Sequence, residues 1–257
     1  MNRARWGQAQ RNIVQWSSIV FLLLIIIVPF CILVWLLFFT QTFAVSAITT
    51  VDAKPSTQES IQTIMKDSSG KNILVIPTDQ LEQKILHDVP QVRDVHIVRK
   101  LPGTLKVIVQ EKKPALLLIS GGSYYFVDTE GIAYENASLD VLPGVVLSTV
   151  KNSDPDAIVK LGANAVESSF VAFITEAQEK LPEITGAQIA EMRIPSLATR
   201  EVHFLLDKNW RILMDTTRSA ADQMGILSRL LEDTITPEEL QTLEYIDLRI
   251  PNRVYYK

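Results

Sequence analysis

An unbroken apolar run of 21 residues, from Ile19 to Phe39, restricts this chain more than any other feature of its sequence. At a helical rise of about 1.5 Å per residue the run is roughly 31 Å long, which matches the hydrocarbon core of a bilayer. Ala44, Ser46 and Ala47 resemble a signal-peptide cleavage site, but the apolar part of a signal peptide is only about 7–15 residues long. We therefore expect residues 19–39 to be a transmembrane helix and not a removed leader.

The charges on the two sides of this run are unequal. Arg3, Arg5 and Arg11 precede it without any acidic residue, whereas all 29 acidic residues follow it. Because Lys and Arg are retained in the cytoplasm, we expect residues 1–18 to be a short cytoplasmic tail and residues 40–257 to lie outside, in the periplasm or extracellular space. The outer part has 22 basic and 29 acidic residues, a net charge of −7, and this argues against nucleic acid as a partner.

After the anchor, the hydrophobic pattern predicts a small α+β unit over residues 43–113, in which two helices cover one face of a short sheet. The first helix is expected to begin with a capping box of Ser56 and Glu59. The expected elements are a strand from Phe43 to Val51, a helix over 57–66, a short strand over 73–76, a helix over 79–86, and strands over 92–100 and 105–110 that are joined by the turn Leu101-Pro102-Gly103-Thr104.

Residues 114–257 predict a larger β-rich unit with two or three helices, so the fold class is α+β. A closing strand starts at Tyr245 and is expected to run on toward Tyr256, with Pro251 indicating an edge position. The other expected elements are strands over 116–119, 124–127, 132–134, 189–194, 201–206 and 211–214, helices over 161–181 and 220–232, and a short helix from Thr236 with Glu239 in its capping box.

Patterns typical of catalysis or of metal and cofactor binding are not found in the sequence. The three histidines, His87, His96 and His203, have no His or Cys within metal-ligand spacing, and nucleotide-binding and serine-nucleophile motifs are missing. Asp128 and Glu130 are a conceivable acid–base pair, but strands flank them and Gly131 follows, which favours a hairpin turn. The basic residues at 99–100 and 112–113 are either solvated hairpin ends or contacts to lipid headgroups. We expect a non-enzymatic protein with no metal and no cofactor.

The stretch from Pro90 to Pro114 carries a more specific pattern. It reads Pro90-x-Val92, then Val98-Arg99-Lys100-Leu101-Pro102-x-Thr104-Leu105, then Val107-x-Val109-x-Glu111-Lys112-x-Pro114. This pattern resembles the POTRA (polypeptide-transport-associated) domain of the FtsQ/DivIB cell-division proteins. The hairpin Val127–Gly131 and the closing segment Tyr245–Lys257 are similar to the same family, in the family's order. Gln91, Leu101 and Lys112 depart from its usual residues.

The resemblance implies a scaffold with one membrane span that performs no reaction at the division septum of the cytoplasmic membrane. It implies binding to two small coiled-coil membrane proteins, FtsB (DivIC) and FtsL, through a strand that the partner adds to the last strand of the β domain. Arg249 and Arg253 would supply charge selectivity and the apolar residues would supply contact area, although Val254 and Tyr255 could instead pack on their own domain. The expected partner-binding residues are Tyr245, Leu248, Arg249, Ile250, Asn252, Arg253, Val254 and Tyr255.

Two other classes of function stay open at this point. One is a membrane-anchored chaperone or assembly subunit for exported proteins, because POTRA units in general hold extended segments by strand addition. The other is a wall hydrolase that uses Asp128 or Glu130. A transport role would favour several POTRA units and a barrel, whereas this chain predicts one unit and no barrel.

Overall fold

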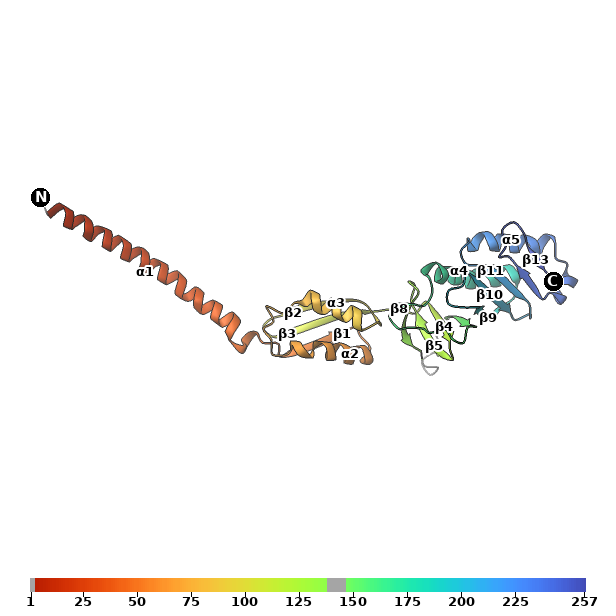
Figure 1. The fold of residues 1–257 in the computed structure, drawn as a ribbon, viewed down its shortest axis with the longest axis horizontal. Helices are drawn as coiled ribbons and strands as arrows, with labels where there is room; N and C mark the ends of the chain where they lie inside the picture. Colours follow the sequence, from red (N-terminus) through yellow and green to blue (C-terminus); the bar gives the residue numbers. More distant parts are fainter. Residues whose placement is uncertain (1–2, 138–146) are drawn as a thin grey trace. The chain divides into compact units, whose positions relative to one another are not determined.

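The computed structural model describes residues 3–137 and 147–257, and for residues 3–20 it describes the helical backbone (Figure 1). Helix α1 (Arg3–Phe39) is 37 residues long and contains Pro29. Its segment Phe21–Phe39 has a mean hydropathy of 3.2 and no buried residue, and it is the one helix in the described part of the chain that is long and apolar enough to cross a membrane. The predicted single anchor agrees with this helix. The predicted tail is helical from Arg3 onward, and residues 1 and 2 lie outside the described residues.

The chain divides into two compact units, the first of which includes α1. The first holds the chain up to Leu86 together with Asp94–Gln110, and the second holds His87–Arg93 with Glu111–Lys257. Strand β2 (Val92–Lys100) therefore starts in one unit and ends in the other. The predicted boundary at 113/114 lies a few residues after Glu111, at which the chain enters the second unit again after β3.

After α1, the first unit is built on a three-stranded sheet in the strand order β1-β3-β2, together with helices α2 and α3 (Figure 1). Strand β1 runs parallel to β3, with Ala47 opposite Thr104 and Val51 opposite Ile108. Buried side chains alternate along β3, so one face of the sheet forms the core together with Ile61. The elements are the short helix η1 (Gln41–Phe43), β1 (Ala47–Val51), α2 (Pro55–Met65), η2 (Lys66–Ser68), α3 (Thr78–Asp88), β2 and β3 (Thr104–Glu111).

Two local predictions in this unit are wrong. Helix α2 starts at Pro55 with Lys54 as its N-cap and has no side-chain cap, because a proline at the first position presets the backbone and leaves no N–H to satisfy. Residues 73–75 form a turn, and residues 73–76 are not a strand. The Asn72 carboxamide oxygen accepts the Leu74 N–H at 2.9 Å, and this Asx-type bond closes the turn before a strand can extend.

The second unit contains a ten-stranded sheet in the order β13-β12-β11-β10-β9-β7-β4-β5-β6-β8. Helices α4 and α5 contribute the apolar residues that pack with one face of it, among them Phe173, Ile174 and Leu227. The elements are β4 (Leu116–Ser120), β5 (Ser123–Val127), β6 (Ile132–Asn136), β7 (Ser148–Asn152), β8 (Ala163–Asn164), α4 (Ser168–Thr185), β9 (Ile189–Ile194), β10 (Glu201–Leu206), β11 (Arg211–Asp215), α5 (Ala220–Asp233), α6 (Pro237–Thr242), β12 (Tyr245–Asp247) and β13 (Tyr255–Tyr256).

Most element positions in this unit match the predictions, including the capping box in which Thr236 and Glu239 bond each other's backbone N–H. The helix predicted from Leu161 begins only at Ser168. Gly162 has a φ of +81°, and the next two residues pair with β6, so the chain is extended where the periodicity indicated a helix. Strand β7 was not predicted.

Candidate partner-binding edge

The closing segment of the chain is a hairpin and not the single strand that the sequence predicted. Strand β12 lies beside β11 in parallel, and the chain then reverses so that β13 pairs with β12 in the antiparallel sense. The reversal includes a tight turn in which the Arg253 N–H donates to the Ile250 carbonyl at 3.3 Å. Asn252 occupies the third position of this turn with a φ of +60°, and Pro251 occupies the second. This is the arrangement of a type II turn, so Pro251 marks a turn and not an edge strand.

Arg249 attaches this hairpin to the sheet. Its guanidinium donates from Nε and Nη2 to the two carboxylate oxygens of Asp247, at 2.9 and 2.6 Å, and from Nη1 to Glu201 at 2.5 Å. The Asp247 carboxylate also accepts the Arg249 backbone N–H at 3.0 Å. These bonds from Arg249 lower the pKa of Asp247 and raise the pKa of Arg249. Arg249 is thus engaged within its own domain, although its side chain remains one-third exposed.

Leu248 lies in the core of the domain. Its side chain is 2% exposed, its backbone N–H donates to the Leu213 carbonyl at 2.9 Å, and its own carbonyl accepts from Arg218 Nη1 at 2.8 Å. A side-chain contact between Leu248 and a partner, as the sequence predicted, does not fit this burial. Leu248 instead fixes the point at which the hairpin leaves the sheet.

Strand β13 is an edge of the ten-stranded sheet, with β12 on one side and no strand from the described residues on the other. Tyr245 and Lys257 exchange both backbone hydrogen bonds, at 3.2 and 3.3 Å, so they are a hydrogen-bonded pair. Such pairs alternate with non-bonded pairs in an antiparallel ladder. Tyr256, which lies opposite Ile246, is therefore in a non-bonded pair, and its N–H and C=O point away from β12 toward the open side.

The side chains around this edge divide into two groups. Ile250, Tyr255 and Tyr256 are 45%, 45% and 41% exposed, and the polar Asn252 and Arg253 are also exposed. Val254 packs against the core of the domain, as in the alternative that the sequence left open, and Tyr245 is half-buried in β12. The exposed members of the predicted set therefore lie in the turn and in β13.

The sequence did not identify the residues that support this edge. Glu201 is in β10, 48 positions before the Arg249 with which it pairs, and it also lies 3.3 Å from His203 Nε2. Burial lowers the pKa of His203. One local signal was available, because Asp247 and Arg249 are two positions apart, a spacing that places strand residues on the same face. Tyr256 was also missed, although it follows Val254 at the same spacing.

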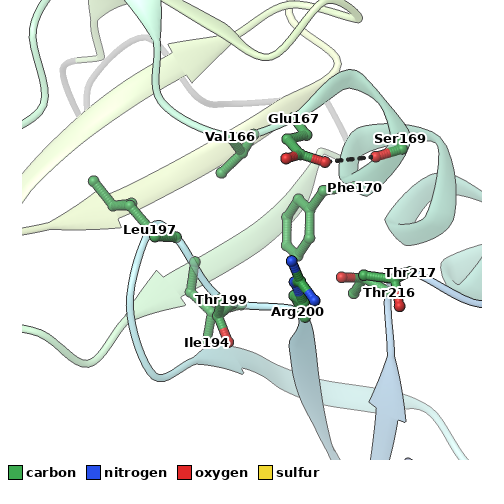
Figure 2. A pocket seen from close by; sticks show the side chains of 11 residues that line it. Val166, Glu167, Ser169, Phe170, Ile194, Leu197, Thr199, Arg200, Thr216 and Thr217 are labelled. Atoms are coloured by element: carbon green, nitrogen blue, oxygen red, sulfur yellow. Dashed lines mark hydrogen bonds between the residues drawn. The ribbon is translucent and has the colours of Figure 1, made fainter.

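A cavity of about 590 Å³ lies elsewhere in the same unit, at the start of α4 (Figure 2). Phe170 and the Arg200 guanidinium lie next to Thr216 and Thr217 in its wall. The one carboxylate in the lining, Glu167, accepts a hydrogen bond from the Ser169 hydroxyl at 3.3 Å. The lining thus has one cation, Arg200, and one carboxylate, Glu167, which already accepts the hydrogen bond from Ser169. This arrangement supplies no pair of groups for acid–base chemistry.

Asp128, the other carboxylate considered from the sequence, is part of a hairpin turn as predicted. It accepts the N–H groups of Glu130 and Ile132 at 2.9 and 3.0 Å, and its second oxygen lies 2.7 Å from Lys112 Nζ. Both charged side chains are largely buried. Lys112 is therefore an internal ion-pair partner and not a solvated hairpin end.

The comparisons with known proteins match this architecture. Residues 43–112 match the family described as POTRA domain, FtsQ-type, which is the class to which the first unit belongs. The chain is 28% identical over 104 residues to the cell division protein FtsQ of Streptomyces griseus, a match that covers 40% of this chain and 49% of that protein. It is 30% identical over 127 residues to the cell division protein DivIB of Clostridium acetobutylicum, which covers 47% and 51%.

A further relative is the cell division protein FtsQ of Streptomyces venezuelae, with 29% identity over 119 residues, 46% of this chain and 43% of that protein. The chain thus matches about half the length of these curated relatives. These matches agree with the resemblance noted in the sequence: residues 43–112 match the FtsQ-type POTRA family, and the chain is similar to FtsQ and DivIB cell-division proteins.

Proposed function

We propose that this chain is a non-enzymatic cell-division protein that crosses the cytoplasmic membrane once and links other division proteins at the septum. Its N-terminus lies in the cytoplasm and the two compact units lie outside, as the Arg-rich start of the chain favours. The similarity to proteins named for cell division supports the cell-division role. The proposed partners are small coiled-coil membrane proteins of the FtsB (DivIC) and FtsL type.

We propose the binding mode from one observation, the open edge of β13. The Tyr256 backbone groups face outward there, and unpaired backbone groups at an edge are a template for an added strand. Ile250, Tyr255 and Tyr256 supply exposed apolar surface on the same hairpin. The partner is proposed to extend the sheet beyond β13, with its side chains against these three residues.

Arg249 and Arg253 have different roles in this proposal. Arg249 is held by Asp247 and Glu201, so it positions the hairpin and contributes charge only through its exposed part. Arg253 is exposed beside the turn, and it is the better placed of the two to pair with an acidic partner residue.

Site-specific photocrosslinking in dividing cells tests this proposal. A photoreactive residue is placed singly at Ile250, Tyr255 or Tyr256, and at Ile158 as a control, because Ile158 is 89% exposed in a loop of the same unit. We expect capture of a small coiled-coil membrane protein from the first three positions and not from Ile158. Equal capture at all four positions, or none in a folded and inserted protein, would show that β13 is not the binding edge.

The chaperone alternative predicts a different set of captured proteins. A chaperone would crosslink to many unrelated exported chains, and its depletion would impair export while septa still form. Depletion of a division scaffold instead produces filamentous cells without septa. These two outcomes separate the hypotheses without any knowledge of the partner.

A further inference from the structure

The end of the first unit that adjoins helix α1 carries exposed apolar side chains. Val75, in the turn after Asn72, is 60% exposed, and Leu101, at the tip of the β2–β3 hairpin, is 61% exposed. These two positions are 26 residues apart in the sequence but belong to the same end of the unit. Large apolar side chains with this exposure call for a physical explanation when they gather beside a membrane anchor.

Hydrogen bonds tie both segments to the residues that leave the membrane helix. Asn72 Nδ2 donates to the Leu37 carbonyl at 2.7 Å, and Leu37 belongs to the apolar segment Phe21–Phe39 itself. The Ile73 N–H donates to the Phe43 carbonyl at 2.8 Å, and Val45 N–H donates to the Lys71 carbonyl at 2.9 Å. The turn with Val75 is therefore held at the end of the membrane span.

The tip of the β2–β3 hairpin is also hydrogen-bonded to residues that follow the apolar helix segment. The Gly103 carbonyl accepts from the Ser46 N–H at 2.8 Å, the Ala47 N–H at 3.3 Å and the Ser46 hydroxyl at 3.2 Å. A Cβ on Gly103 would come within 2.5 Å of the Ala44 carbonyl oxygen, so glycine permits this close approach. Only a few residues separate Phe39 from Ala44, and three of them form the compact helix η1, so the tip lies close to the end of the apolar segment Phe21–Phe39.

The charge at this end of the unit is opposite in sign to that of the whole outer part. Lys66, Lys71 and Lys100 are exposed beside the turn and the tip, against one carboxylate, Asp67, in the same segments. The outer part as a whole has 22 basic and 29 acidic residues. Lysines next to a membrane span are attracted to anionic lipid headgroups.

We infer that the turn 71–76 and the hairpin tip 101–103 lie in the outer headgroup layer of the bilayer. Val75 and Leu101 insert among the lipids, and Lys66, Lys71 and Lys100 contact anionic headgroups. This second, peripheral contact restricts how the first unit can tilt on its anchor. The inference requires α1 to span a membrane, and it does not depend on the division role or on the β13 edge.

Depth-dependent quenching in vesicles tests the inference with the full chain. Cys31 is replaced by alanine, and a single cysteine labelled with an environment-sensitive fluorophore is placed at Val75, Leu101 or Leu86. Leu86 is the matched control, because it is 40% exposed on α3 of the same unit, and α3 carries the chain from the turn toward the start of β2. The vesicles contain phosphatidylcholine with or without phosphatidylglycerol, and the quencher is a lipid spin-labelled near its headgroup.

We expect blue-shifted emission and strong quenching at Val75→Cys and Leu101→Cys, and neither at Leu86→Cys. Phosphatidylglycerol should increase the quenching, and the variant Lys71→Gln with Lys100→Gln should lose that increase, whereas Lys84→Gln on α3 should keep it. Water-like emission at all three labels would overturn the inference. Equal quenching at all three would also overturn it, because it would indicate adsorption of the whole unit. Unchanged circular dichroism of each variant shows that the label has not unfolded the unit.

Discussion

Replacing Asp128 by alanine should destabilise the second unit by several kcal/mol, because this carboxylate has three partners inside the protein. Lys112 Nζ lies 2.7 Å away, and the side chains of Lys112 and Asp128 are 14% and 8% exposed. Removing one partner of a buried ion pair costs about 3–5 kcal/mol, since the other charge stays buried without compensation. The N–H groups of Glu130 and Ile132 lose their acceptor as well. A typical bond of this kind contributes about 1 kcal/mol, and the cost given for breaking the ion pair already includes part of this loss.

The variant Asp128→Asn separates these contributions. Its amide oxygen can still accept the two N–H bonds of the turn, so it should cost about 2 kcal/mol less than alanine. The double variant Asp128→Asn with Lys112→Met removes both charges, and it should recover much of the loss because no unpaired ammonium stays buried. A sum of the two single losses would instead mean that the residues act independently.

Tryptophan fluorescence during denaturant unfolding of residues 40–257 measures these free energies. Trp210 is the only tryptophan after the membrane span, and it is 1% exposed in the second unit, so the signal reports on that unit alone. A loss below about 1 kcal/mol for Asp128→Ala would refute the reasoning, because it would place the pair in the range of exposed ion pairs. Loss of wall-fragment turnover with unchanged stability would instead support the hydrolase hypothesis.

The same fluorescence assay checks two further predictions. Gly131→Ala should lower the free energy of unfolding by more than about 2 kcal/mol, because φ is +84° and a Cβ would overlap the Val166 carbonyl oxygen. Gly122→Ala should lower it by only about 1 kcal/mol, because φ is +77° but the space around it is open. Equal losses of stability in the two variants would contradict this difference. Stability should also fall with decreasing pH in two stages. Burial lowers the pKa of His203, so the unfolded chain takes up its proton first and stability falls below about pH 6.5, whereas Asp247, with a pKa lowered by Arg249, adds a second loss below about pH 4. His203→Gln should remove the upper stage, and a pH profile that this variant leaves unchanged would contradict the assignment.

Elements with strong apolar periodicity could be predicted from the sequence. Strand β2 begins at Val92 and ends at Lys100 as predicted, because Pro90 and the Pro102-Gly103 turn limit it on both sides. Helix α5 was also found, since its apolar stripe ends in a polar segment. Strand β7 was missed because two of its inward residues are polar. The Asn152 side chain donates to Ser120 at 3.0 Å and Ser148 bonds Gln178, so their burial depends on partners that are about 30 positions away.

The candidate site was predictable only in its location. The sequence placed the closing segment at an edge of the sheet, and β13 is such an edge, but the reversal before β13 was missed. Partner binding by this segment stays a prediction. Pro251 followed by Asn252 is a turn signal as well as an edge signal, and the left-handed φ of Asn252 decides between the two. The bond from Arg249 to Glu201 joins strands that are far apart in the chain, and no local pattern encodes it.

The shortness of β13 has a consequence for how a partner would bind. A two-residue edge offers few outward backbone groups, and each added backbone bond contributes only about 0.5–1.5 kcal/mol in net terms. Such bonds would set the register and direction of an added strand, but they would not overcome the cost of ordering it, which is several kcal/mol. If a partner binds as proposed, the apolar surface of Ile250, Tyr255 and Tyr256 would have to supply most of the affinity, and Arg249 would contribute by holding the turn that presents this surface. Specificity at this edge would thus depend on the side chains that the turn displays, while the backbone of β13 would determine only where the added strand lies.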